Sequence, residues 1–228
     1  FMSFEGMEGC GKSTQVRRLA RRLRGLGVPV IVTLEPGGTR IGKDIRRVLL
    51  DARNKTLTPP AELMLYLADR AQHVEEIIQP ALRTGKWVVC DRFADATVVY
   101  QGMVRGQDMK LVKRLNETVT RRIRPHITFL LDCPVELGLQ RALRRNLKGP
   151  HKGQDRFEKE KISFHRKVRN AYLELARKER KRFVVIDGML PREKAEGEIS
   201  KTFNPTWRMR AGCSTGRIGA EPWPALAL

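Results

Sequence analysis

Short apolar runs alternate with amphipathic stretches along most of this chain. The apolar runs have the length and polar boundaries of buried strands, and the amphipathic stretches have the period of surface helices. Strands are predicted at Phe1–Glu5, Val28–Leu34, Trp87–Cys90, Ile127–Leu131 and Phe183–Ile186. Helices are predicted at Ser13–Gly25, Ile41–Leu50, Ala61–Leu82, from Asp95 onward, Met109–Ile123, Val135–Arg145, Phe157–Arg180 and Arg192–Lys201. This alternation is typical of an α/β fold, in which helices cover both faces of a parallel sheet.

Two segments interrupt this pattern. Residues 146–154 are polar and rich in glycine, proline and lysine, and residues 204–228 contain scattered prolines without a sustained period. The chain shows no internal repeat, and its 228 residues, of which 41% are hydrophobic, suffice to bury one core. We therefore predict a single domain over residues 1–203, followed by an irregular or disordered tail over 204–228.

Membrane and secretory signals are not found in the sequence. No apolar run approaches the ~20 residues that a spanning helix needs, and no charged segment precedes an apolar one at the start. The four cysteines are scattered, without the spacing of a metal site: Cys10, Cys90, Cys133 and Cys213. We expect them to be the reduced thiols of a cytoplasmic protein without a membrane partner.

The formal net charge of +20 raises the question of nucleic acid. Arginines crowd the first predicted helix and the region 121–182, where they fall on several helical faces rather than along one stripe. Aromatic residues, on which bases stack in nucleic-acid binders, make up only 6% of the chain. We predict nonspecific affinity for polyanions at low salt, and no specific nucleic-acid partner.

The segment Gly6–Ser13 matches the phosphate-loop pattern G-x-x-x-x-G-K-[S/T] between a predicted strand and a predicted helix. Its glycines let successive backbone N–H groups point at phosphate oxygens, Lys12 reaches the β- and γ-phosphates, and Ser13 holds Mg²⁺. The loop therefore predicts binding of a nucleoside triphosphate. The residues expected to contact it are Gly6, Met7, Glu8, Gly9, Cys10, Gly11, Lys12, Ser13 and Thr14.

A second phosphate site is indicated by Asp91-Arg92, directly after a predicted strand. The carboxylate of Asp91 is suited to Mg²⁺ and its water shell, and the guanidinium of Arg92 to a bidentate phosphate contact. An enzyme that brings two phosphates together needs cations on both sides, whereas GTPases have no acceptor phosphate. The sequence also lacks their base-reading N-K-x-D motif. These observations favour a small-molecule kinase.

Four groups of residues together resemble the thymidylate kinase family, over roughly residues 1 to 200. They are Glu35-Pro36-Gly37-Gly38-Thr39, Tyr66 with Arg70, Asp91-Arg92, and Thr97 with Tyr100-Gln101-Gly102. The resemblance implies a three-layer α/β/α P-loop kinase fold with a five-stranded parallel sheet and a mobile lid. It also implies transfer of the ATP γ-phosphoryl group to dTMP, with Mg²⁺ as cofactor, in a homodimer.

The same resemblance implies how the acceptor base and sugar are bound. Tyr66 stands where the family has an aromatic ring that stacks on thymine, and Arg70, four residues on, would hydrogen-bond a base carbonyl. Thr97 and Gln101 fall at positions that read the base edge. Tyr100 matches the ring that crowds the sugar C2′ and disfavours ribonucleotides.

The phosphate-handling residues are implied in the same way. Arg92 matches the arginine that clamps the dTMP phosphate, and Asp91 the carboxylate near the magnesium that Ser13 also holds. Glu8 matches a carboxylate near the acceptor sugar. Glu35 and Pro36 belong to the acceptor loop.

The lid is expected at about residues 141–157, ending in Asp155-Arg156-Phe157-Glu158. Gly9 stands where another subclass of the family carries a phosphate-loop arginine, so the resemblance implies that lid arginines supply the transition-state charge. Arg141 would lie nearer adenine. Arg145 and Arg156 are candidate catalytic residues with Lys12 and Arg92, and the choice among Arg144, Arg145 and Arg156 for the γ-phosphate stays open.

Two alternatives remain at this point. The first is a kinase of the same fold for another nucleoside monophosphate, against which the Glu35–Thr39 segment and Tyr100-Gln101 argue. The second is a basic, nucleic-acid-associated P-loop ATPase or a catalytically silent nucleotide-binding module. Dependence of ADP release on added dTMP separates the second from the kinases.

Overall fold

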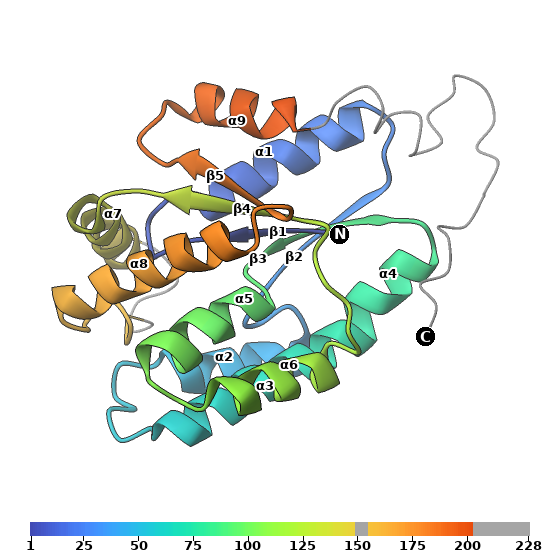
Figure 1. Ribbon diagram of the computed structural model, residues 1–228. Coiled ribbons are helices and arrows are strands. Elements are labelled where there is room, and N and C mark those ends of the chain that lie inside the picture. Colours follow the sequence, from blue (N-terminus) through green and yellow to red (C-terminus); the bar gives the residue numbers. More distant parts are fainter. Residues whose placement is uncertain (149–154, 203–228) are drawn as a thin grey trace.

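The computed structural model describes residues 1–148 and 155–202, so the middle of the expected lid and nearly all of the tail lie outside the described residues. The described strands form one parallel five-stranded sheet in the order β2-β3-β1-β4-β5 (Figure 1). They are β1 (Met2–Glu5), β2 (Val30–Leu34), β3 (Trp87–Asp91), β4 (Ile127–Asp132) and β5 (Phe183–Asp187). The predicted fold class and sheet are thus confirmed.

The described helical segments follow the predicted order. They are α1 (Lys12–Gly25), α2 (Arg40–Leu50), α3 (Pro59–His73), η1 (Val74–Ile78), α4 (Gln79–Arg83), α5 (Ala94–Thr97), η2 (Val98–Val104), α6 (Met109–Val119), α7 (Val135–Lys148), α8 (Ile162–Lys178) and α9 (Arg192–Lys201). The single helix predicted at 61–82 is one continuous rod, in which a π-helical turn, η1, joins α3 to α4. A second π-helical segment, η2, continues α5.

Three predicted helix boundaries were wrong by several residues. The helix predicted at Met109–Ile123 ends at Val119, the one predicted at Val135–Arg145 runs to Lys148, and the largest difference is at the start of α8. The helix expected from Phe157 begins only at Ile162, because residues 156–160 form turns, with the Glu160 N–H bonded to the Phe157 carbonyl. Phe157 is buried against the ring of Tyr100, with ring centroids 5.5 Å apart. In the sequence, Phe157 continues the spacing of apolar residues that is typical of a helix. In the structure, its buried ring holds a turn in place.

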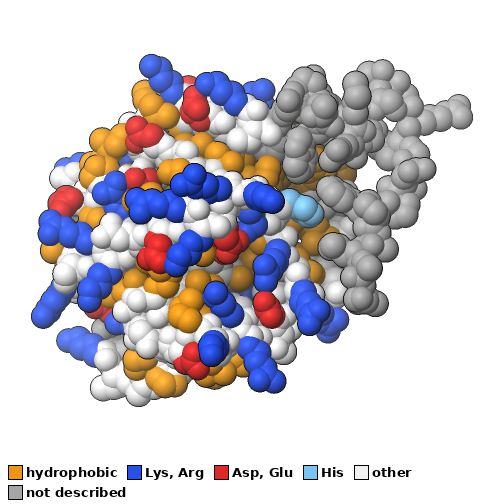
Figure 2. All heavy atoms as spheres, in the orientation of Figure 1, with side chains coloured by type: hydrophobic (Ala, Val, Ile, Leu, Met, Phe, Trp, Pro, Cys, Tyr) orange, Lys and Arg blue, Asp and Glu red, His pale blue; other side chains and the backbone are white. Residues whose placement is uncertain are grey.

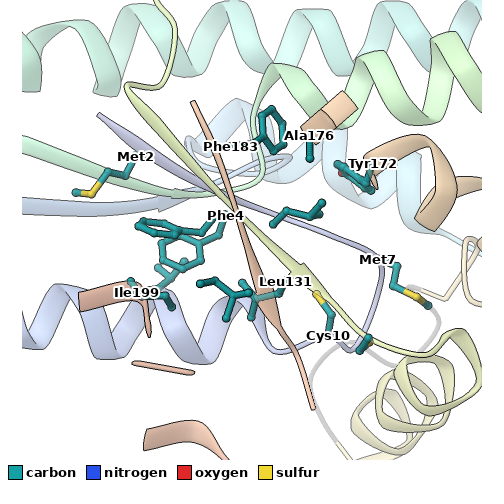
Figure 3. Close-up of a cluster of buried hydrophobic side chains, with 14 of the residues drawn as sticks. Met2, Phe4, Met7, Cys10, Leu131, Tyr172, Ala176, Phe183 and Ile199 are labelled. Carbon is teal, nitrogen blue, oxygen red and sulfur yellow. The ribbon is translucent and has the colours of Figure 1, made fainter. Parts of the chain in front are cut away.

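The helices cover both faces of the sheet (Figure 1). α1 and α9 contact each other on one face, while α8 packs on β4 and β5 from the other, beside η2. The central strand β1 is buried along its whole length. Phe4 packs on Phe129 of β4 with ring centroids 5.0 Å apart, within the cluster of apolar side chains that Figure 3 shows.

This topology determines where a ligand can bind. β1 lies between β3 and β4, so the chain turns to opposite sides of the sheet after β1 and after β3. Parallel α/β sheets open a crevice at such a point, at the carboxyl ends of the strands. Glu5 and Asp91 are the last residues of the two neighbouring strands β1 and β3, and the phosphate loop follows Glu5 directly.

No helix in the described part of the chain is long and apolar enough to cross a membrane. Lysine and arginine side chains are distributed over the face in Figure 2, with acidic and apolar side chains between them. On this face they do not gather into one stripe.

Candidate active site

A cleft of about 970 Å³ opens at the carboxyl ends of β1, β2 and β3. Most of the residues singled out from the sequence line it. These are Glu8, Gly9, Cys10, Gly11, Lys12, Ser13, Thr14, Glu35, Pro36, Tyr66, Asp91, Arg92, Thr97, Tyr100, Gln101, Arg141 and Arg145. Gly6, Met7, Arg70 and Arg156 were also expected to contact ligands, but they are not among the lining residues.

The phosphate loop has the conformation that its glycines predict. Gly6, Gly9 and Gly11 have φ angles of 132°, 70° and 101°, which L side chains rarely adopt. α1 begins at Lys12, so its N-terminal N–H groups face the cleft, as at other anion sites. The Lys12 ammonium lies over the loop and donates hydrogen bonds to the carbonyls of Gly6 at 3.0 Å and Met7 at 2.7 Å.

The phosphate loop also packs directly on α7. A Cβ atom added to Gly9 would lie 1.9 Å from the carbonyl oxygen of Gly138, on the first turn of that helix. A Cβ atom on Gly138 would in turn lie 2.7 Å from the carbonyl oxygen of Glu8. Because α7 carries Arg141 and Arg145, this backbone contact fixes the start of the arginine-bearing helix against the loop.

Ser13 and Asp91 form a pair of oxygen donors beside the loop. The Ser13 hydroxyl donates to Asp91 Oδ2 over 2.5 Å. No group of three potential metal ligands occurs among the His, Cys, Asp and Glu side chains of the described residues. Mg²⁺ commonly takes one or two protein oxygens and completes its shell with water and substrate phosphates. The hydroxyl and carboxylate therefore fit a magnesium bound together with a nucleotide.

Arg92, which follows β3, is held rigidly by contacts that include a residue of the phosphate loop. Its backbone has a φ of 71°, in the left-handed region that favours glycine, and its side chain is only 17% exposed. Nη2 donates to Glu8 Oε1 at 2.9 Å, and the guanidinium lies 5.2 Å from the centroid of the Tyr100 ring. Burial alone would lower the pKa of Arg92, but Tyr100, Tyr172 and Glu8 raise it well above the usual range.

Glu8 is the anionic partner at the cleft floor. Its Oε1 also accepts a hydrogen bond from the Tyr100 hydroxyl at 2.7 Å, and its Oε2 lies 3.6 Å from Nδ1 of the fully buried His165. Burial favours the neutral acid, but His165, Arg92 and Lys12 outweigh it and lower the pKa of Glu8 well below the usual range. The carboxylate is therefore ionised at neutral pH.

Arg70 is placed differently from the expectation that it contacts the base. It is 1% exposed and lies behind the cleft wall. Its donors bind Glu35 Oε2 at 2.8 Å, Thr97 Oγ1 at 2.8 Å, Asn116 Oδ1 at 2.7 Å and the Phe93 carbonyl at 3.1 Å. In this arrangement Arg70 orders the residues that form the wall, and a direct bond to the base stays a prediction.

The remaining acceptor residues line one wall together. Tyr66 from α3 faces the cleft with Thr97 from α5 and Gln101 from η2. The Gln101 amide donates to the buried Glu62 carboxylate at 2.9 Å, so its orientation is fixed. Glu35 is tied on its other oxygen to His73 Nδ1 at 2.8 Å, which anchors the loop after β2.

Two exposed arginines of α7 line the cleft. Arg141 donates weakly to the Gly188 carbonyl at 3.4 Å, and Arg145 contacts Glu158 at 3.4 Å with half of its side chain exposed. Both line the cleft, one helical turn apart on α7, as the sequence predicts. Arg144 is exposed and is not among the lining residues.

Arg156 lies outside the cleft lining, and its contact with the γ-phosphate, one of three alternatives from the sequence, stays a prediction. Its Nη2 pairs with Glu62 Oε2 at 2.7 Å, and its Nε donates to the Leu49 carbonyl at 2.5 Å. Glu62, on α3, is 1% exposed and also lies 3.5 Å from Nε of Arg105. Arg156 pairs with this buried carboxylate outside the cleft lining, although Arg156 lies next to the expected lid in the sequence.

Arg46 is a lining residue that sequence reasoning missed. It comes from α2 and donates to the Pro36 carbonyl at 2.8 Å, and burial lowers its pKa. The sequence contained a signal for it, since Arg46 shares one helical face with the buried Gly42 and Leu49. An arginine on the buried side of an amphipathic helix needs an anionic or carbonyl partner there.

Comparisons with known proteins agree with this geometry. The model of the family described as thymidylate kinase matches residues 4–199. A thymidylate kinase of Citrifermentans bemidjiense is 54% identical over 82% of this chain and 84% of its own length. One of Geotalea uraniireducens is 50% identical over 88% and 94%. The crystal structure of thymidylate kinase from Ehrlichia chaffeensis matches with a TM-score of 0.71 and 32% identity, covering 90% of this chain and 98% of that one.

Proposed function

We propose that two separate sets of cations carry the reaction of this chain. The chain belongs to the thymidylate kinase family and transfers the γ-phosphoryl group of ATP to dTMP, giving dTDP. The supporting observation is the distribution of charge in the cleft. Lys12, Arg141 and Arg145 come from the phosphate loop and α7. Arg92 follows β3 and contacts Tyr100 of η2, Tyr172 of α8 and Glu8 of the loop. A kinase that acts on a nucleotide needs this division because both of its substrates carry phosphate.

On the donor side, the phosphate-loop N–H groups and Lys12 bind the ATP phosphates, with Arg141 toward adenine. Arg145 supplies charge at the transferring group, since Gly9 leaves the loop without an arginine. Ser13 and Asp91 would hold Mg²⁺, whose charge offsets that of the β- and γ-phosphate oxygens.

On the acceptor side, Arg92 grips the phosphate of dTMP, with Arg46 as a second cation in the same cleft. Tyr66 stacks on the base, while Thr97 and Gln101 read its edge. Tyr100 packs near the sugar C2′, and Glu8 lies near the sugar and holds Arg92. Glu35 and Pro36 shape the loop around the acceptor, with Arg70 ordering the wall behind them.

The chemistry requires no general base from the protein. The acceptor phosphate has a second pKa of about 6, so its oxygen is a ready nucleophile at neutral pH. The transition state is loose and metaphosphate-like, so alignment and charge stabilisation lower the barrier. The cations of the cleft provide the alignment of the two phosphates and the stabilisation of charge.

We further propose that the enzyme is a cytoplasmic homodimer. Met64 on α3 and Leu111 on α6 are exposed apolar side chains, 50% and 46% accessible, and these helices contact each other. A second copy that covers both would bury apolar surface. Sedimentation at several concentrations tests the oligomeric state, and a Met64→Lys substitution should shift it toward the monomer.

The acceptor preference tests the proposed site. ADP release should require a monophosphate, with dTMP best, dUMP weaker and UMP much weaker, because a methyl group in an apolar pocket is worth about 1–3 kcal/mol. Lys12→Ala should reduce turnover strongly with every acceptor and serves as the control for contaminating kinases. Equal turnover of dTMP and UMP would contradict the pocket assignment, and ADP release stimulated by DNA without dTMP would favour the ATPase alternative.

A further inference from the structure

Two buried residues outside the cleft lining, Glu5 and Tyr172, connect to Arg92. Tyr172 lies on α8, 80 residues from Arg92 along the chain, and is 1% exposed. Its hydroxyl contacts Arg92 Nη1 at 3.2 Å and Glu5 Oε2 at 2.7 Å. Glu5 ends β1, directly before the phosphate loop, and is completely buried.

The direction of these hydrogen bonds is determined by the chemistry of the groups. A guanidinium only donates, so the Tyr172 oxygen must accept from Arg92. The single hydroxyl proton is then free for Glu5, whose oxygen lies at the distance of a strong bond to a carboxylate. When Glu5 is ionised, the hydroxyl therefore links its carboxylate to the arginine.

Glu5 also holds the backbone beside Arg92. Its other oxygen, Oε1, accepts the N–H of Phe93 at 2.8 Å, and the N–H of Arg92 donates to the Phe4 carbonyl at 2.9 Å. The last two residues of β1 thus fix the backbone on both sides of Arg92, whose φ of 71° is unfavourable for arginine. Through Tyr172 the same carboxylate fixes the far end of the side chain.

We propose that Glu5 and Tyr172 are positioning residues that hold the Arg92 guanidinium in place for the acceptor phosphate. The inference rests on the proposed function, in which Arg92 contacts that phosphate. A long arginine side chain otherwise loses rotamer freedom when it binds a ligand. The contacts of Arg92 with Tyr172 and β1 remove this rotamer freedom before dTMP binds. Packing does not explain the hydroxyl, because a phenylalanine at position 172 would fill the same space without needing a partner.

The test compares two ligands that differ only in the group that Arg92 is proposed to bind. Tyr172→Phe should weaken dTMP binding about tenfold, the loss expected for a hydrogen bond to a charged group. Binding of thymidine, which lacks the phosphate, and of ATP should change less than twofold. Calorimetric titration of the full-length chain measures all three. Equal weakening of dTMP and thymidine would overturn the proposal, because it would show a general change of the pocket.

A matched control lies on the same strand as Glu5. Ser3 is buried, and within the described chain its hydroxyl bonds to the Thr128 hydroxyl at 2.8 Å. Ser3→Ala removes a buried hydroxyl from β1 without touching Arg92. It should lower the melting temperature and leave the ratio of dTMP to thymidine affinity unchanged. A change in that ratio as large as that of Tyr172→Phe would also overturn the proposal.

A double-mutant cycle with Arg92→Ala keeps the proposal falsifiable if one variant is poorly stable. Once Arg92 is absent, Tyr172→Phe should have no further effect on dTMP affinity. An undiminished effect would show that Tyr172 acts by another route. If Arg92→Ala alone left dTMP binding intact, the assigned role of Arg92 would fail first, and the positioning role would fail with it. Glu5→Gln keeps the shape but loses one acceptor, so it should weaken dTMP binding in the same direction.

Discussion

The two ends of the cleft, which we propose bind the acceptor and the donor, hold their arginines in different ways. Arg92 at the acceptor end is 17% exposed and contacts Glu8, Tyr100 and Tyr172 at 2.9 to 3.3 Å. Arg145 at the donor end is 53% exposed, and its nearest acceptors lie at 3.3 and 3.4 Å. Both arginines are proposed to bind phosphate, yet only one is fixed by the fold.

The difference matches what each end has to do. The acceptor phosphate must be placed with its attacking oxygen in line, and a prearranged guanidinium does this at little entropic cost. The donor end must follow charge that develops on the γ-phosphoryl group during transfer. A loosely held arginine on α7 can move with that group. The predictions below test this division, from the largest expected effect to the smallest.

Removing the donor-end arginine should have the largest effect. Arg145→Ala is expected to lower kcat on the order of 10³-fold, as for arginines that stabilise a phosphoryl-transfer transition state, with little change in KM for dTMP. The matched control is Arg144→Ala, one residue earlier on the same helix and outside the cleft lining. Pre-steady-state measurement of ADP formation gives the rate of the chemical step.

Arg156 sharpens the same prediction. Because it pairs with Glu62, Arg156→Ala should lower the melting temperature by several degrees and reduce kcat far less than Arg145→Ala. The reverse order of the two kcat effects would mean that Arg156 leaves Glu62 for the γ-phosphate during turnover.

Removing Arg92, the arginine at the acceptor end, should weaken the binding of dTMP and leave the binding of ATP unchanged. Arg92→Ala is expected to weaken dTMP about 10²-fold, since it removes a charged pair to the phosphate. ATP affinity should stay within twofold, because Arg92 faces only the acceptor in our assignment. Titration with each nucleotide separately measures both quantities. Loss of ATP affinity with retained dTMP affinity would show that the two ends have been assigned in reverse.

The fixed acceptor end should also have a signature in stability. Burial, followed by repulsion from Asp95, raises the pKa of Glu5 from 4.5 to about 7, against the opposing effects of Arg92, Tyr172 and the Phe93 N–H. Between these pH values the folded chain binds the proton more tightly than the unfolded chain. The free energy of unfolding should therefore fall as pH rises from 4.5 to 7, by on the order of 3 kcal/mol from this group.

Urea unfolding at pH 5 and pH 7.5 measures this change, and Glu5→Gln should flatten it. Asp69, whose pKa burial raises to about 6, contributes with the same sign in both proteins, so the difference between them isolates Glu5. Parallel profiles for the two proteins would contradict the assignment.

The smallest effect is expected from shortening the chain. Residues 204–228 follow the last described helix, and every residue assigned a role precedes Tyr172 or is Tyr172 itself. A chain ending at Phe203 should keep its dTMP-dependent turnover within about twofold. Loss of most of the activity, or of soluble protein, would show that residues 204–228 are needed for the site or for folding.

The sequence predicted the sheet and the phosphate loop well, because both are local patterns. The strands are short apolar runs with polar boundaries, and the loop is one contiguous motif. The start of α8 was misplaced because Phe157 continues the helical spacing of apolar residues while packing on Tyr100. Likewise, a π-helical turn such as η1 leaves the amphipathic pattern of its rod almost unchanged.

The site was predicted less completely, because its energetics depend on distant partners. Arg70 bonds to residues 35, 27 and 46 positions away, and Arg156 bonds to Glu62, 94 positions away. Spacing along one helix identifies such arginines as candidates but does not say which acid will pair with them. Glu5 and Tyr172 read as ordinary core residues in sequence, and only the fold brings them to Arg92.

The contact between Gly9 and Gly138 has a consequence for how such enzymes diversify. The resemblance implies that another subclass of the family carries an arginine at the position of Gly9, but a side chain there in this chain would collide with the backbone of α7. A lineage with this architecture therefore cannot acquire the loop arginine by one substitution, since the intermediate would push the helix off the loop before the new cation could act. The helix has to retreat first.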